Sequence, residues 1–303
     1  MLLIGENIHI ISKTVREALE NKDENFIKNL IKFQKKMDCI DLNIGPARGK
    51  LDKIFEWLIP LAEGKNISFD STNTNAIIEG LKLVPDAHNC FINSISNDSE
   101  KLEPLTDCAI ENSCNIIALT MSKQSGIPKT ADERLEIVFE IYEKCIEKGI
   151  EYNKIFFDPL ILPVQAAQSQ GIEALNTIKI IKESFDPQVN TVIGLSNISN
   201  GTPKQLRPLI NRVFGVLAYG AGLDAVIMDA KDEELVRIFK MLENNSPNSQ
   251  IDELYINLTN IIKNFEELED IKFDKNNIDE QNIIKTAAVL LNKTIYSDSF
   301  TQV

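Results

Sequence analysis

The stretch Val192-Ile193-Gly194-Leu195-Ser196-Asn197-Ile198-Ser199-Asn200-Gly201 decides the fold, because a β-branched apolar run stops there in small and amide side chains. This pattern predicts a buried strand that ends at a functional surface. Three other apolar runs end in the same way, at Asp70, Asn93 and Asp158. A helical pattern follows each of these runs. The polar residues at the strand ends are therefore expected to converge on one rim of the fold. In a barrel of parallel strands, that rim holds the active site.

Eight units of strand and helix are predicted along the chain. The expected strands are 2–7, 39–43, 67–70, 91–93, 116–121, 155–158, 192–196 and 225–229. Apolar residues at helical spacing predict helices over 15–37, 51–61, 77–81, after 98, and over 135–146, 172–185 and 209–217. This alternation favours an α/β fold, a TIM (β/α)8 barrel with right-handed crossovers, over a sandwich or a bundle.

The apolar spacing of the C-terminal tail predicts further helices after the eighth unit of strand and helix. Ser246-Pro247-Asn248-Ser249 interrupts the pattern, and apolar residues at steps of three and four resume from Ile251 to Leu268. A polar loop at 270–279 is expected before a last helix around 283–291. We therefore expect a single barrel domain over 1–303, with a helical insertion at about 243–280. The insertion should pack on the side of the barrel or at a subunit interface.

Composition limits the classes of function. The 303 residues, 43% of them hydrophobic, can bury one large core. The 32 basic and 45 acidic residues leave a formal charge of −13 without a basic cluster, so nucleic-acid binding is not expected. Five cysteines without a C-x-x-C pair, and two histidines, predict reduced core thiols and no metal site. The chain shows no leader-like segment and no apolar run of membrane-spanning length, so a cytoplasmic location is expected.

The strand ends supply the candidate binding residues. Each has a structural alternative, since Asp70 could cap the next helix and Asp158 could fix a turn before Pro159. As a set at the same end of successive strands, they favour a binding site. Carboxylates accept hydrogen bonds from N–H groups and amides both donate and accept, which suits a flat aminopyrimidinone heterocycle. The strand-end residues are Glu6, Asn43, Asp70, Asn93, Asp158, Ser196 and Asn197.

Other kinds of site have weaker support. Neither His9 nor His88 stands in a recognised spacing with a nucleophile, and no G-x-S-x-G or G-x-G-x-x-G motif occurs. The turn Gly194-Leu195-Ser196 could instead hold a phosphate through backbone N–H groups.

Ordered motifs give the chain a resemblance to a known family. They include Ile4-Gly5-Glu6, Asp41-Leu42-Asn43-Ile44-Gly45-Pro46, Asp158-Pro159-Leu160-Ile161-Leu162-Pro163, Gly194-Leu195-Ser196-Asn197 and Arg207-Pro208-Leu209-Ile210-Asn211-Arg212. In these runs the chain resembles the methyltetrahydrofolate methyltransferases that deliver a methyl group to a corrinoid protein, typified by the enzyme serving the corrinoid iron-sulfur protein. The resemblance covers residues 1 to about 240 and about 283 to 300.

This resemblance implies a pterin-binding barrel, usually a homodimer. It implies transfer of the N5 methyl group of methyltetrahydrofolate to the cobalt(I) of a cobalamin-type corrinoid carried by a partner protein, in one-carbon metabolism. It also implies that Asp70, Asn93 and Asp158 hold the pterin ring, and that Asn197 is the catalytic residue near the methyl-bearing nitrogen. We further assign Glu6, Gly194, Ser196 and Arg207 to the pterin site, and Asn43, Met121 and Asn200 to the side facing the corrinoid.

Two other functions stay open. A dihydropteroate-synthase-like condensation on a pterin diphosphate would require a basic cluster at the late strands, where Arg207 and Arg212 occur without a Lys-x-Arg-type cluster. The third possibility is a non-catalytic pterin-binding partner of a methyltransferase complex. Turnover of methyltetrahydrofolate with cob(I)alamin separates the three.

Overall fold

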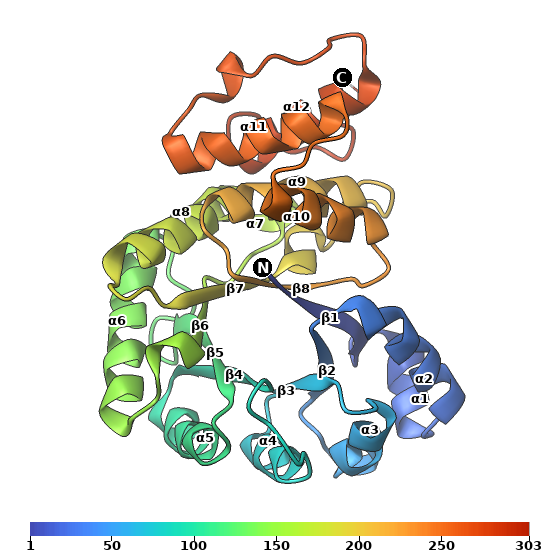
Figure 1. Cartoon of the computed structure of the whole chain (residues 1–303), viewed down its shortest axis with the longest axis vertical. Helices are drawn as coiled ribbons and strands as arrows, with labels where there is room; N and C mark the ends of the chain where they lie inside the picture. Colours follow the sequence, from blue (N-terminus) through green and yellow to red (C-terminus); the bar gives the residue numbers. More distant parts are fainter. Residues whose placement is uncertain (303) are drawn as a thin grey trace.

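A closed barrel of eight parallel strands forms the centre of the molecule (Figure 1), in a computed structural model that describes residues 1–302. The strands follow one another around the barrel in sequence order, and β1 pairs with β8 to close it. The predicted TIM barrel is confirmed. The strands are β1 (Leu2–His9), β2 (Cys39–Gly45), β3 (Asn66–Ser71), β4 (Phe91–Asn97), β5 (Asn115–Ser122), β6 (Ile155–Asp158), β7 (Asn190–Gly194) and β8 (Ala225–Met228).

Helices surround the barrel and connect its strands. They are α1 (Lys13–Glu20), α2 (Glu24–Phe33), α3 (Ile54–Leu61), α4 (Thr74–Leu81), α5 (Ser99–Asn112), α6 (Ala131–Lys148), α7 (Val164–Ala167), α8 (Ser169–Ser184), α9 (Arg207–Gly220), α10 (Glu233–Asn244), α11 (Gln250–Asn264) and α12 (Ile278–Leu290). Short 3₁₀ helices occupy Gln34–Lys36, Gly49–Leu51, Tyr152–Lys154, Leu195–Ser199 and Leu268–Asp270.

The helix predicted over 15–37 is two helices in the structure. The chain breaks between α1 and α2, where Lys22 takes a φ of 52°. Asp23 then caps α2 by accepting a hydrogen bond from the backbone N–H of Phe26. The cap satisfies an amide that would otherwise lack a partner in the first turn, so it favours a new helix over a continued one.

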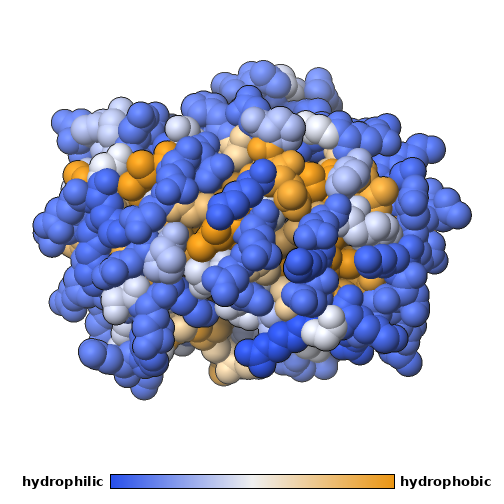
Figure 2. Space-filling view, turned by 90° about the horizontal axis from the view of Figure 1, so that it is seen from below, coloured by the Kyte–Doolittle hydropathy of each residue, from blue (hydrophilic) through white to orange (hydrophobic). Residues whose placement is uncertain are grey.

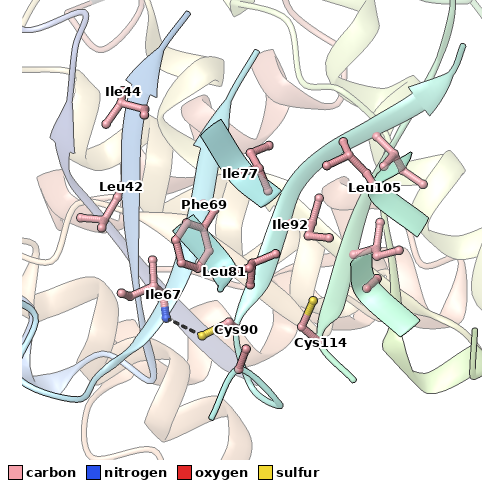
Figure 3. Packing of buried hydrophobic residues seen from close by; sticks show 14 of the residues in the cluster. Leu42, Ile44, Ile67, Phe69, Ile77, Leu81, Cys90, Ile92, Leu105 and Cys114 are labelled. Carbon is pink, nitrogen blue, oxygen red and sulfur yellow. Dashed lines mark hydrogen bonds between the residues drawn. The ribbon is translucent and has the colours of Figure 1, made fainter. Parts of the chain in front are cut away.

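Apolar side chains fill the layer between strands and helices. Figure 3 shows Phe69 of β3 and Ile92 of β4 close to Ile77 and Leu81 of α4, and all four are buried. Residues that point outward to this layer alternate with residues that point into the barrel. The helices therefore fix which strand positions are left to face the interior.

Four of the five cysteines belong to this packing, whereas Cys39 lies in the barrel interior. Cys90 accepts a hydrogen bond from the Ile67 backbone N–H over 3.4 Å (Figure 3), and Cys114 lies in the same cluster. All five cysteines are buried and free, which confirms the prediction of reduced core thiols.

Helices α11 and α12 add a layer outside α9 (Figure 1). Leu254 and Leu258 of α11 are buried there. A Cβ at Gly220, the last residue of α9, would lie 2.4 Å from the Thr259 carbonyl oxygen of α11, so the two backbones approach closely. The apolar stripe predicted for the tail thus packs on the side of the barrel.

The outer side of the barrel is mainly hydrophilic. Figure 2 shows the side that carries α3, α4 and α5, where apolar side chains lie among charged and polar ones. Leu83 and Ile110, at the ends of α4 and α5, remain exposed. Such scattered apolar residues are normal on protein surfaces. Within residues 1–302, no helix is both long and apolar enough to cross a membrane.

Candidate active site

The interior of the barrel changes from apolar to polar along the strands. Its lower part is filled by the buried side chains of Ile4, Cys39, Phe91, Ile117, Phe156, Val192, Ala225 and Ile227. Side chains two positions further along a strand point to the same face. The polar residues that follow therefore also enter the barrel, at the carboxyl ends of its strands. We call this end the barrel mouth, and its polar residues are Glu6, Asp41, Asn43, Asp70, Asn93 and Asp158.

Asp41 connects neighbouring strands at the base of the mouth. Its side chain is 2% exposed, and its Oδ1 accepts hydrogen bonds from Ser68 Oγ and, over 3.2 Å, from Asn93 Nδ2. Ser68 lies directly opposite Asp41 in the β2–β3 register, which brings the two side chains together. Burial raises the pKa of Asp41 to about 6, although these hydrogen bonds favour the charged form.

Asp70 lies beside Asp41, close enough for each carboxyl to influence the pKa of the other. Asn43 Nδ2 donates to Asp70 Oδ2 over 2.5 Å, and these two residues are also paired in the β2–β3 register. Burial, and then the adjacent Asp41 charge, raise the pKa of Asp70 well above its ordinary value. Asp70 does not cap α4, since Asn73 accepts the hydrogen bond from the Ala76 N–H.

Asp158 is the last residue of β6 and lies in the barrel mouth. Its Oδ1 accepts from the Leu160 N–H over 2.8 Å, so it fixes the turn, as the structural alternative expected, while remaining inside the barrel. Burial raises the pKa of Asp158 to about 6, and the positive charge of Arg134 opposes the rise. Arg134 is fully buried and donates to the Pro128 carbonyl and to Gln170 Oε1.

Glu6 connects β1 to the 3₁₀ helix that follows β7. Ser196 Oγ donates a hydrogen bond to its carboxylate. Burial raises the pKa of Glu6 to about 7 despite that hydrogen bond, and the negative charges of Asp229 and Asp41 add to the rise. Glu6 can therefore give or accept a proton near neutral pH.

Asn197 lies on the 3₁₀ helix that follows β7. Val192 points into the barrel, so a side chain at Gly194 would do so as well. A Cβ at Gly194 would lie 3.0 Å from Asn197 Nδ2, so the Asn197 amide lies next to this interior position. Asn200 Nδ2 donates to Asn197 Oδ1 over 3.3 Å. Asn197 is exposed, so a ligand in the mouth can reach it.

The other predicted site residues are placed differently. Arg207 begins α9, and its Nε donates to the Thr202 carbonyl over 3.0 Å. Met121 is half-buried near the end of β5, two positions after Leu119, which packs on the interior cluster. Asn43, which we expected to face the corrinoid, is bound to Asp70 inside the mouth.

Sequence reasoning missed Asp41 and Arg134 as site residues. Asp41 could have been found, because it stands two positions before Asn43 and must share its face of the strand. Arg134 lies in α6, where nothing in the local pattern indicates that it reaches the turn beside Asp158.

Two hollows lie at opposite ends of the barrel. A groove of about 310 Å³ follows β2 and β3, and Pro46, Arg48 and Thr72 are among its lining residues. A hollow of about 950 Å³ lies at the amino ends of the strands, where Lys182 pairs with Asp224 at 3.0 Å. The polar residues Asp41, Asp70 and Asp158 lie at the mouth, at the other end of the barrel from this larger hollow. Within residues 1–302, no group of three or more His, Cys, Asp or Glu side chains could hold a metal ion.

Comparisons with known proteins agree with a pterin site. The chain is 25% identical over 244 residues to the methylcorrinoid:tetrahydrofolate methyltransferase of Eubacterium limosum, covering 78% of this chain and 88% of that protein. It is 27% identical over 248 residues to the methionine synthase of Mycobacterium leprae (strain TN), covering 76% of this chain but only 20% of that protein.

A solved structure supports the fold. The dihydropteroate synthase from Anaplasma phagocytophilum with bound 6-hydroxymethylpterin-monophosphate aligns with a TM-score of 0.53 at 16% identity, covering 86% of this chain and 99% of that one. Residues 44–229, which extend from β2 to just beyond β8, match the pterin binding enzyme family. Because this match spans more than half of the chain, the protein belongs to the pterin binding enzymes.

Proposed function

We propose that this protein transfers the N5 methyl group of methyltetrahydrofolate to the cobalt(I) of a corrinoid protein. The observation that carries the proposal is the row of acceptors that β3, β4 and β6 present in the barrel mouth, formed by Asp70, Asn93 and Asp158. These groups complement the N–H edge of an aminopyrimidinone ring. The similarity to a methylcorrinoid:tetrahydrofolate methyltransferase along 88% of its length supports the choice of reaction.

The chemistry requires help at the nitrogen that loses the methyl group. As the carbon–nitrogen bond breaks and cobalt attacks the methyl carbon, the nitrogen keeps the bonding electrons, so it must carry a proton or another positive partner. Asn197 can turn its carbonyl oxygen toward a protonated nitrogen, once that oxygen leaves Asn200. A buried carboxylate at this place would stabilise the ground state as well, which would not speed the reaction.

The partner supplies the cobalt, and this chain supplies binding and orientation. We assign Met121 and Asn200 to the side that meets the corrinoid protein, of which the corrinoid iron-sulfur protein is one example. We also propose that residues 1–303 work as one domain, in a cytoplasmic homodimer.

Arg207 and Arg212 are already bound to other groups of the protein, which argues against a condensation on a pterin diphosphate. Arg212 forms an ion pair with Asp232, over 2.7 Å from Nη2 and 3.1 Å from Nε, and Arg207 donates to the Thr202 carbonyl. A diphosphate would need cations that are free to bind it.

Mixing the protein with methyltetrahydrofolate and cob(I)alamin tests the proposal. Loss of the cob(I)alamin absorbance together with release of tetrahydrofolate is the expected result. Formation of pteroate from a pterin diphosphate and p-aminobenzoate would support the condensation instead. Binding of methyltetrahydrofolate without turnover would support a non-catalytic role, and absence of binding would overturn the pterin assignment.

A further inference from the structure

The Asn93 side chain has a defined polarity in the mouth. Its Nδ2 donates to Asp41 Oδ1 over 3.2 Å, and within residues 1–302 its Oδ1 receives no hydrogen bond from the protein. Asn93 follows Phe91 by two positions, so its side chain points into the barrel above the apolar interior. The amide therefore presents its carbonyl oxygen to the open part of the mouth.

The contacts of Asp41 make a reversed orientation of the Asn93 amide energetically unfavourable. Ser68, which is fully buried, donates to the same Oδ1 atom, and the β2–β3 register places Ser68 beside Asp41. Asp41 also contacts Asp70. If the Asn93 amide turned over, its oxygen would face the Asp41 oxygen, and two acceptors would oppose each other without a proton between them.

We propose that Asp41 is a positioning residue that selects ligands with a donor edge, by fixing which end of the Asn93 amide faces them. This inference rests on the proposed function. With Asp41 in place, Asn93 presents an acceptor between the carboxyls of Asp70 and Asp158. Removal of the Asp41 carboxyl frees the amide to turn its NH₂ group into the mouth, where it opposes the N–H groups of a pterin.

Two substitutions at residue 41 separate this role from simple loss of charge. Asp41→Ala removes the acceptor, so the calorimetric Kd for methyltetrahydrofolate should rise about 10- to 100-fold. Asp41→Asn keeps an oxygen for Asn93 and Ser68, and its NH₂ can donate to Asp70. Its Kd should stay within about threefold of wild type.

Ser68→Ala serves as the matched control. It removes a buried hydrogen bond to the same Asp41 oxygen but leaves the Asn93 bond in place. It should lower the melting temperature and change the Kd by less than about threefold, because Asp41 keeps its hydrogen bond from Asn93. A rise in its Kd as large as that of Asp41→Ala would show that any disturbance of Asp41 suffices, and would overturn the proposal.

A double-mutant cycle tests whether Asp41 acts through Asn93. Asn93→Ala and Asp41→Ala/Asn93→Ala should differ by less than about threefold in Kd, because the orientation of a missing amide cannot matter. An effect of Asp41→Ala that persists undiminished in the Asn93→Ala background would contradict the inference, as would an unchanged Kd in Asp41→Ala itself.

One measurement needs no variant at residue 41, so it still tests the proposal if Asp41→Ala fails to fold. The Asn93 side-chain NH₂ signals of the wild-type protein, assigned by their loss in Asn93→Ala, should exchange slowly with water, with and without methyltetrahydrofolate. Exchange as fast as that of the exposed Asn200 amide would overturn the proposal. If wild-type protein does not bind methyltetrahydrofolate but the Asn93 signals are protected, the proposed function fails while the orientation by Asp41 stands.

Discussion

Gly194 and Asn197 lie in close contact after β7: the Asn197 amide lies beside the position that a side chain at residue 194 would take. The closest approach of a Cβ built on Gly194 is 3.0 Å, to Asn197 Nδ2. The glycine at the end of β7 therefore sets where the candidate catalytic amide lies.

Gly194→Ala should displace Asn197 by a few tenths of an ångström. Small misplacements of a reacting group are costly, so we expect methyl transfer to slow by about tenfold or more while the Kd for methyltetrahydrofolate stays close to wild type. Single-turnover kinetics and calorimetry measure the two effects separately. A normal rate would show that the position of Asn197 is not critical.

Asp70→Ala and Asp158→Ala should each weaken methyltetrahydrofolate binding by about 1.5 to 3 kcal/mol, the range for hydrogen bonds to charged groups. Calorimetry measures the affinity, and circular dichroism checks the fold. Asp107→Ala is a suitable control, because Asp107 of α5 forms an exposed ion pair with Lys148 of α6, away from the mouth. Unchanged affinity in both test variants would remove these carboxyls from the site.

Glu6 should make the protein less stable as the pH rises. Its folded-state pKa of about 7 lies above the ordinary value of 4.5, so its contribution is favourable at low pH and is lost as the pH rises through about 7. Glu6→Gln removes this titration. Relative to wild type, the variant should gain up to about 3 kcal/mol in the free energy of unfolding between pH 4.5 and pH 8.

Urea denaturation at several pH values measures this difference. The Ser196 hydroxyl can still donate to the amide oxygen of the glutamine, so the contact between β1 and β7 is retained. Parallel pH profiles for wild type and Glu6→Gln would mean that Glu6 titrates normally.

Gly220→Ala should separate α11 from α9. The new methyl group would meet the backbone oxygen of Thr259 at 2.4 Å, and backbone atoms cannot yield as a side-chain tip can. Overpacking of this kind costs about 1 to 3 kcal/mol, measurable by urea unfolding. Gly171→Ala is the matched helical control, since its Cβ would lie 3.4 Å from the Leu290 oxygen. Equal stability of the two variants would show that the α9–α11 contact yields freely.

The barrel could be predicted because each strand carries its own signal. Ile155-Phe156-Phe157-Asp158, for example, is an apolar run that ends in a polar residue, and it forms β6 over the same residues. The break after α1 was missed because apolar spacing continues across it, while a single side chain, Asp23, starts the new helix. Local caps thus outweigh periodicity at helix ends.

The candidate site was only partly predictable. Strand ends gave Asp70, Asn93 and Asp158, but the network that orients them depends on register between strands. Asp41 meets Ser68 and Asn93 only because β2, β3 and β4 align at that level. The position of α11 could not be predicted either. An apolar stripe indicates that one face of a helix is buried, but it does not indicate which surface buries that face.

The rate of methyl transfer in Asn197→Ala tests the central claim most directly. Asn197 should bind the developing charge more strongly in the transition state than in the ground state. At saturating methyltetrahydrofolate and cob(I)alamin, the single-turnover rate should fall about 10²- to 10³-fold, equivalent to about 2.7 to 4 kcal/mol, with a much smaller change in Kd. A near-normal rate, with only the stability altered, would mean that Asn197 merely shapes the turn with Ser196 and Ser199, and would contradict the mechanism.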